Sequence, residues 1–167
     1  NMNGKIAALI KGDNCVIGLE STILNLSTDK PMLLRPGGVP TEKIEDKLGL
    51  TLLKSNTFPS SETKIIAPGM MESHYAPRCK LNLNKKTAKT GELFLGFGDM
   101  PKQCIGLNLS QNGDLNEAAT NFFATLTDID EMASMMKLNS VSVAPIPNVG
   151  LGIAINDRLK RAATPKN

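Results

Sequence analysis

The sequence predicts an α/β protein in which a short α/β segment precedes a small Rossmann-like domain built on a mostly parallel sheet. Two observations support this fold class. From Lys80 onward, short apolar stretches alternate with amphipathic helical stretches, and the order strand–helix–strand–helix favours a parallel sheet. The first fifty residues hold further strands, but too little material to close a core alone. The 167 residues leave room for one ordinary domain or two small ones.

The first segment is predicted to contain two helices and two strands. They are a short helix over 3–11, a strand over 15–26, a strand over 32–35 and a helix over 42–48. Thr41 is placed to cap the second helix, and Gly49 to end it. Pro36-Gly37-Gly38 stops the second strand, and we expect the two strands to pair antiparallel.

A structured linker is predicted over residues 54–79. This stretch holds three prolines and four serines and has no sustained period. It also carries Ile65, Ile66 and Tyr75, which is more apolar material than a solvated tether needs.

The second half supplies the alternating elements of the predicted parallel sheet. Strands are expected over 80–83, 92–96, 104–108 and 141–146, and helices over 114–126 and 152–163. The stretch from Asp128 to Met136 is either a second helix or a kinked extension of the first. Leu115, Ala118, Ala119, Phe122 and Leu126 share one face of the first helix, as expected of a helix packed on a sheet.

Composition excludes several classes of protein. No apolar run approaches the ~18–20 residues that a membrane span needs, so no membrane partner is expected. The net charge is +3 without a dense Lys/Arg block, unlike a dedicated nucleic-acid binder. Cys15, Cys79 and Cys104 form neither a disulfide framework nor a metal knuckle. Free thiols and the absence of an export signal predict a cytoplasmic protein.

Taken singly, the polar residues are ambiguous. Gly96-Phe97-Gly98 lacks the third glycine of a dinucleotide fingerprint and is better explained as a turn at a strand end. Ser21 does not lie in a G-x-S-x-G elbow, so a serine hydrolase is not expected. Glu20 beside two hydroxyls suits a hydrogen-bond network at a strand edge. Arg35 suits a surface ion pair or an anion ligand equally well. His74, alone, is better explained by structure than by catalysis.

The succession of motifs is more specific than any one residue. GLESTILNL, LLRPGG, APGMMESHYAP and GLGIAINDRLKRAA follow one another at 18–26, 33–38, 67–77 and 150–163. This succession resembles the C-terminal part of the long-form threonylcarbamoyl-AMP synthases. The resemblance implies three parts: the C-terminal remnant of a YrdC-like catalytic domain over 1–53, a linker over 54–79, and a Rossmann-like C-terminal domain over 80–167.

The resemblance also implies a reaction. Family members condense L-threonine, bicarbonate and ATP into threonylcarbamoyl-adenylate and release pyrophosphate, and the product serves adenosine modification in tRNA. Ser21 and Thr22 would then contact L-threonine, and Arg35, Tyr75 and His74 would contact ATP. ATP is a substrate that arrives with Mg²⁺, and no residue of the chain demands a metal of its own. Transfer RNA would be met only indirectly, through a downstream transferase.

The sequence departs from the family in one respect that affects its partners. The family's K-x-R and S-x-N nucleotide motifs lie upstream of the matched stretch and are not present here. We therefore expect the missing N-terminal half of the catalytic domain as a partner, and a homo-oligomer is a further possibility. Two alternatives stay open: a non-catalytic docking or regulatory fragment of the same enzyme, and a related carbamoyl-transfer protein.

Overall fold

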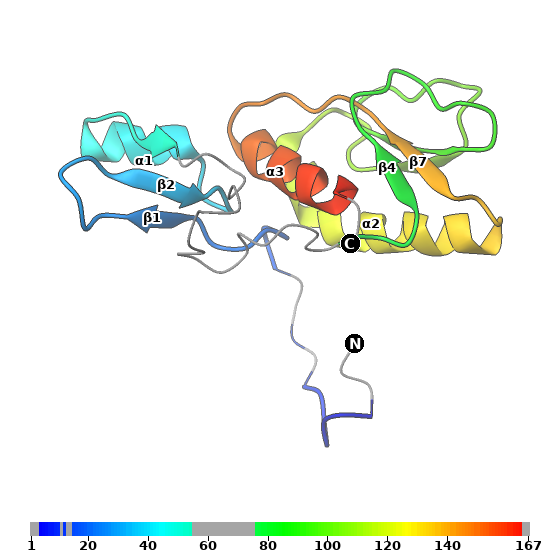
Figure 1. The fold of residues 1–167 in the computed structure, drawn as a ribbon, viewed down its shortest axis with the longest axis horizontal. Coiled ribbons are helices and arrows are strands. Elements are labelled where there is room, and N and C mark those ends of the chain that lie inside the picture. Colours follow the sequence, from blue (N-terminus) through cyan, green and yellow to red (C-terminus); the bar gives the residue numbers. More distant parts are fainter. Residues whose placement is uncertain (1–3, 11, 13–14, 55–75, 165–167) are drawn as a thin grey trace.

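The computed structural model describes residues 4–10, 12, 15–54 and 76–164. These residues form a three-stranded sheet in the first segment and a four-stranded sheet in the second, with α3 beside the smaller sheet (Figure 1). The architecture is mixed α/β, as predicted. Among the described residues, no helix has the length and apolar character required to cross a membrane.

The smaller sheet has the strand order β1-β2-β3. Its elements are β1 (Ile23–Asn25), β2 (Met32–Arg35), the crossover helix α1 (Thr41–Leu48) and β3 (Leu53–Lys54). β1 and β2 pair antiparallel, which confirms the prediction. β3 pairs parallel with β2 and was not predicted. Two residues of exposed strand carry too little pattern to detect, and they fall where the linker was expected to begin.

Two predictions for the first segment were wrong. Residues 4–10 form turns and irregular backbone rather than a helix. Leu9 and Ile10 are 81% and 97% exposed, so an apolar helix face would have nothing to pack against, and so short a helix is marginal alone. The strand expected over 15–26 is confined to β1. The residues before β1 approach α2 instead: a Cβ on Gly18 would lie 2.5 Å from the carbonyl oxygen of Thr120.

The C-terminal end of α1 agrees with the prediction, and the N-terminal end does not. Gly49 adopts a left-handed conformation (φ +66°) and its N–H donates to the carbonyl of Glu45, which ends the helix as expected. Thr41, however, is a buried first residue of the helix, and Pro40 occupies the cap position without a side-chain hydrogen bond. Thr41 therefore lies inside the helix rather than at its cap, and the extended backbone of Pro40 (φ −56°, ψ 140°) marks where the helix begins.

The larger sheet is parallel throughout, with the order β4-β7-β5-β6. Its strands are β4 (Lys80–Asn82), β5 (Leu93–Gly96), β6 (Gly106–Asn108) and β7 (Ser140–Val143). All four β5 residues are buried, because helices and loops cover both faces of this central strand. The prediction of a small Rossmann-like domain with a mostly parallel sheet is therefore confirmed.

Two helices complete this part of the molecule. α2 (Leu115–Met135) is one continuous helix, so the stretch after Asp128 extends it rather than forming a second helix. Asp114 caps α2 by accepting from the backbone N–H groups of Asn116 and Glu117. α3 (Leu151–Ala163) packs against α2 and β4. The core between helices and sheet is built on side chains that are fully buried, among them Leu93, Leu95, Phe122, Ile129, Val141 and Ile155.

Candidate functional site

The site residues of the first segment lie on or directly beside two loops that the antiparallel pairing of β1 and β2 brings together. Residues 20–22 lead into β1, and residues 36–38 follow β2; we call them the loop pair. Ile23 at the start of β1 is registered with Arg35 at the end of β2, so both loops lie at the same end of the sheet. Residues distant in the sequence thus become neighbours.

The two loops touch through their backbones. Gly38 N–H donates to the carbonyl oxygen of Glu20 at 2.8 Å. A Cβ on Gly37 would lie 2.3 Å from that same oxygen and 2.5 Å from the nitrogen of Thr22. Real Cβ atoms do not come this close, so the loops can meet only because position 37 lacks a side chain.

Arg35 and Ser21 are in direct contact. The guanidinium donates from Nε at 3.2 Å and from Nη2 at 2.9 Å to the carbonyl oxygen of Ser21, and Nη2 lies 3.2 Å from the Ser21 hydroxyl. Ser21 is exposed and Arg35 is half-buried. A hydroxyl and a guanidinium on one accessible rim can bind the carboxylate or amine of a small zwitterion and the oxygens of a phosphate.

Of the other predicted site residues, the structure describes Thr22 but not His74 or Tyr75. The Thr22 hydroxyl donates to the carbonyl of Val39 at 2.8 Å and accepts from the Val39 N–H at 3.1 Å, so it ties β1 to the chain after the glycines. His74 and Tyr75 lie outside the described residues. The structure brings Ser21, Thr22 and Arg35 together, and the substrate role of each stays a prediction.

A buried group of charges on α3 contacts the back of the loop pair. Asp157, Arg158 and Arg161, which we call the α3 ion cluster, are all buried. Arg161 donates to both carboxylate oxygens of Asp157, at 3.0 and 3.1 Å. Arg158 Nη1 lies 2.6 Å from Asp157 Oδ2, and Arg158 Nε donates to Glu20 Oε2 at 2.8 Å. Arg158 belongs to residues 76–164, which we call the second domain. The second domain therefore contacts Glu20, the residue that precedes Ser21.

This cluster was missed in the sequence, although a signal was present. Asp157 and Arg161 stand four residues apart in the NDRLKRAA stretch, the spacing of an ion pair within a helix. We predicted an amphipathic helix with an apolar side, and most of that side is indeed buried. Three charged residues of the helix, Asp157, Arg158 and Arg161, are buried too, whereas Lys160 is exposed. Arg158 contacts Glu20 and Pro36 of the first segment, and the helix sequence by itself does not indicate such a contact.

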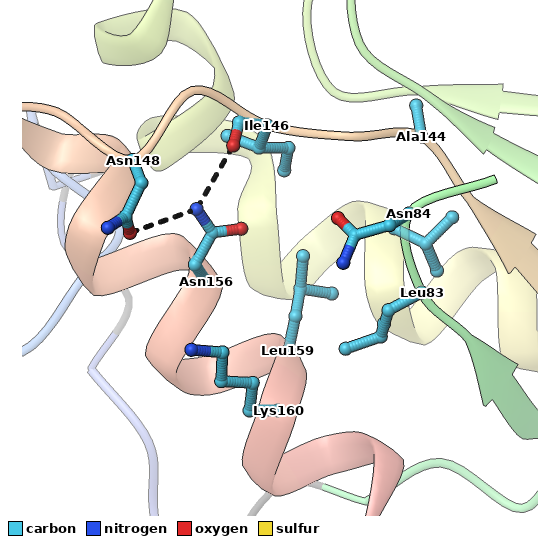
Figure 2. Close-up of a pocket in the computed structure, with 9 residues that line it drawn as sticks. Leu83, Asn84, Ala144, Ile146, Asn148, Asn156, Leu159 and Lys160 are labelled. Carbon is cyan, nitrogen blue, oxygen red and sulfur yellow. Dashed lines mark hydrogen bonds between the residues drawn. The ribbon is translucent and has the colours of Figure 1, made fainter. Parts of the chain in front are cut away.

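The second domain has its own cavity at the carboxyl ends of β4 and β7, the edge where ligands bind in many parallel sheets. It measures about 210 Å³ and is rimmed by polar side chains of Asn84, Asn148, Asn156 and Lys160 (Figure 2). Asn156 donates to the carbonyl of Ile146 at 3.1 Å. Amide and ammonium donors suit an anion, and none of the residues that line this cavity is acidic.

The remaining candidate groups prove structural. Gly98 (φ +75°) closes a turn after β5, and its N–H donates to the carbonyl of Ser110 at 2.7 Å, as expected for a strand-end turn. Burial, together with the neighbouring Asp130 carboxylate, raises the pKa of Cys79 to about 12, which keeps this thiol protonated and unreactive. No cluster of three or more potential metal ligands occurs among the described residues.

Fold and loop pair together define a class: an α/β segment with a polar loop site, joined to a small parallel α/β domain by the ion pair of the buried Arg158 with Glu20. The sequence profile of the threonylcarbamoyl-AMP synthase C-terminal domain matches residues 39–164, and the chain belongs to this family. The match begins just after Gly38, so the loop pair precedes it.

Relatives extend the similarity to nearly the whole chain. A threonylcarbamoyl-AMP synthase of Pyrococcus abyssi is 31% identical over 175 residues, covering 96% of this chain and 50% of the relative. The Bacillus subtilis and Schizosaccharomyces pombe synthases are 27% and 28% identical, and the alignments cover 98% of this chain and 50% and 47% of those relatives. The chain thus spans about half the length of these relatives.

Solved structures agree. The crystal structure of P. abyssi Sua5 complexed with L-threonine superposes with a TM-score of 0.80 at 27% identity, over 98% of this chain and 51% of that one. A structure of a P. abyssi Sua5 variant, with an adjacent histidine and tyrosine changed to alanine, gives a TM-score of 0.67 at 24% identity over 88% of this chain. The second comparison supports the fold.

Proposed function

We propose that this chain forms the C-terminal portion of an L-threonylcarbamoyladenylate synthase, a nucleotidyltransferase that serves threonylcarbamoyladenosine modification of tRNA. The observation that carries the proposal is the contact between Ser21 and Arg35, contributed by two separate motifs and held at one rim. Membership of the family and the similarity to a Sua5 structure that contains L-threonine support it.

The proposed reaction has two steps. The threonine amine bonds to the carbon of bicarbonate with loss of water, which gives a carbamate. A carbamate oxygen then bonds to the α-phosphorus of ATP, the bond to the bridging oxygen of the β-phosphate breaks, and pyrophosphate leaves. Most of the rate would come from binding and orientation, because the reactants supply the nucleophile and the leaving group themselves.

Residues of this chain take positioning and electrostatic roles in this proposal. The Ser21 hydroxyl binds L-threonine, with Thr22 beside it. The Arg35 guanidinium binds ATP phosphates and stabilises the charge that develops as the adenylate forms. Tyr75 and His74, from the linker, contact the nucleotide and exclude water from a reactive mixed anhydride. Mg²⁺ arrives with ATP and is held mainly by phosphates and water.

The partner expected from this assignment is the upstream half of the catalytic domain. Large apolar side chains of the first segment are exposed, among them Leu53 of β3 at 44% and Leu26, directly after β1, at 63%. Burying them on further strands would stabilise the sheet, since a sheet needs a covered apolar face. A cytoplasmic location, predicted from the free thiols, belongs to the same proposal.

Reconstitution tests the proposal directly. The chain is mixed with the upstream half, or expressed with it as one polypeptide, and pyrophosphate release is measured with and without L-threonine and bicarbonate. We expect release that depends on both, and ATP binding by calorimetry only in the mixture. Ser21→Ala and Arg35→Ala should abolish most of the activity, whereas Lys43→Ala, which removes an exposed charge from α1, should not. Pyrophosphate release without threonine dependence would overturn the assignment.

The same variants decide the alternative of a docking or regulatory module, which the separate core of the second domain favours. If Ser21→Ala and Arg35→Ala leave the biological activity intact while surface changes on 114–163 abolish it, the module hypothesis replaces the enzymatic one.

A further inference from the structure

One side chain of the second domain holds both members of the loop pair. Arg158 Nε donates to Glu20 Oε2 at 2.8 Å, and Arg158 Nη2 lies 2.7 Å from the same oxygen. Nη2 also donates to the carbonyl oxygen of Pro36 at 3.1 Å. Glu20 immediately precedes Ser21, and Pro36 immediately follows Arg35. The guanidinium therefore bridges the two backbones that carry the proposed threonine and phosphate ligands.

Burial makes this bridge rigid. Arg158 is 2% exposed and Arg161 is 2% exposed, with Asp157 between them at 7%. Two guanidinium groups face two carboxylates, those of Asp157 and Glu20, so the charges balance. A buried ion pair adds little net stability, but loss of one partner leaves a buried charge uncompensated. The cluster therefore favours the one geometry in which every charge is paired, because any other geometry leaves a buried charge unpaired.

We infer that Arg158 is a positioning residue for the proposed substrate site: it fixes the spacing of Ser21 and Arg35 without touching substrate. This inference rests on the proposed function. It gives the second domain a role in the reaction, because Arg158 of α3 contacts the two loops that carry the proposed substrate-binding residues. Asp157 and Arg161 support Arg158 by fixing the orientation of its guanidinium.

The choice of arginine follows from the geometry. A guanidinium presents several N–H donors in a fixed plane, so Nε and Nη2 reach a carboxylate while Nη2 also reaches a carbonyl. A lysine ammonium is a single point on a flexible stem. Arg158→Lys keeps the charge and can satisfy Glu20 or Pro36, but it cannot hold the two loops in the same register.

The test uses the complete enzyme that contains this chain, with Arg158→Lys, Glu20→Gln and the double variant. For each we would measure KM for L-threonine and ATP, kcat, and the thermal unfolding midpoint. A small misplacement of binding groups costs about tenfold to a hundredfold in kcat/KM. We expect a loss of that size in both single variants, with higher KM values, and a double variant no worse than the more severe single one.

Asp130→Asn is the matched control. Asp130 makes an ion pair with Arg78 (3.0 Å) in the same domain but does not contact the loop pair. This variant should lower the unfolding midpoint and leave the KM for L-threonine unchanged, which is the signature of a structural role outside the loop pair. If Arg158→Lys and Glu20→Gln behave like Asp130→Asn, the positioning role is refuted.

Two further outcomes are decisive. Should Arg158→Lys fail to fold, the Glu20→Gln variant decides whether the inference holds. This variant is expected to fold, because the side chain at position 20 is 25% exposed and the amide oxygen introduced there can still accept a hydrogen bond. A KM for L-threonine equal to the wild-type value in a folded Glu20→Gln enzyme would refute the inference alone. A wild-type enzyme without threonine-dependent pyrophosphate release would refute the proposed function and the inference with it.

Discussion

The two halves of the described chain differ in what they bury. Residues 76–164 enclose a continuous core in which Leu95, Phe122 and Ile129 are completely inaccessible to solvent. In residues 15–54 the buried apolar side chains are few, Leu33 and Leu52 among them, and large apolar side chains stay exposed. The second half is therefore organised by its own core. The first half is held by hydrogen bonds, glycine packing, the Arg158–Glu20 ion pair and the packing of Ile17 and Leu19 on that core.

Because of this difference, most of the folding stability and the proposed substrate-binding residues are found in different halves of the chain. The proposed substrate ligands are in the half with little core, and the residues that hold them in place, above all Arg158, come from the half with a core. A polar site on a poorly buried scaffold needs external support, because an exposed loop held by a few hydrogen bonds opens at low free-energy cost.

The largest expected effect comes from removing core volume. Phe122→Ala in α2 should lower the free energy of unfolding by about 3–5 kcal/mol, because the ring is fully buried and packs edge-to-face on Phe123. Leu26→Ala in the first half should change it by less than about 0.5 kcal/mol, since Leu26 is 63% exposed. Chemical denaturation followed by circular dichroism checks both. Equal losses would show that the two halves share one core.

A smaller effect is expected at Asp130, which anchors the chain before β4 to α2. Its carboxylate accepts from the backbone N–H groups of Arg78 (2.8 Å) and Cys79 (3.0 Å). Burial alone would raise the pKa of Asp130, but these hydrogen bonds outweigh burial and lower it. The charged form is thus favoured in the folded state. Asp130→Asn should cost about 1–3 kcal/mol at neutral pH, because it weakens the acceptor for the N–H groups of the exposed Arg78 and the buried Cys79.

The pH dependence gives this prediction its sign. A folded pKa below the unfolded value, near ~3.9, means that Asp130 stabilises the fold fully above that value. The contribution is lost as the pH falls through the lower, folded pKa. Wild-type stability should therefore fall more steeply in acid than that of Asp130→Asn. Parallel curves for the two proteins, from denaturant midpoints at several pH values, would contradict this explanation.

The sequence predicts the fold of the second half of the chain better than that of the first half. The second half was predictable, because buried strands and amphipathic helices leave a periodic record: Ala118, Ala119, Phe122 and Leu126 share one face and are all buried. The helix expected over 3–11 was wrong, because local propensity does not reveal whether a surface exists for an apolar face.

The proximity of the candidate site residues was predictable in part, for a different reason. The order of the motifs selected Ser21, Thr22 and Arg35 as candidates, and the structure places all three at or beside the loop pair, while their substrate roles stay predictions. The support from Arg158 could not be read from the sequence, since its partner Glu20 is 138 residues away. The i, i+4 spacing of Asp157 and Arg161 predicts a pair, but nothing local indicates that the pair is buried or what it faces.

The smallest expected effect concerns a second link between the halves. Glu42 in α1 accepts a hydrogen bond from the backbone N–H of Gly150, at the start of α3, at 2.9 Å. This hydrogen bond is the main cause of a pKa of Glu42 below its ordinary value. Because Glu42 is largely exposed, solvent screens the interaction, and Glu42→Gln should change the free energy of unfolding by about 0.5 kcal/mol or less. A direct probe is therefore better than stability.

The amide resonance of Gly150 supplies that probe. In the wild type its chemical shift should follow the ionisation of Glu42, with a midpoint below the value of 4.5 typical of a free glutamate. The contact is complete above that pH and is lost as the pH falls through the lowered pKa. Glu42→Gln should remove the titration while leaving amides of the second core, such as that of Val141, unchanged. A Gly150 amide that ignores pH in the wild type would mean that Glu42 does not join the halves. The support of the loop pair would then depend on Arg158 and the Thr120 contact to the carbonyl of Val16.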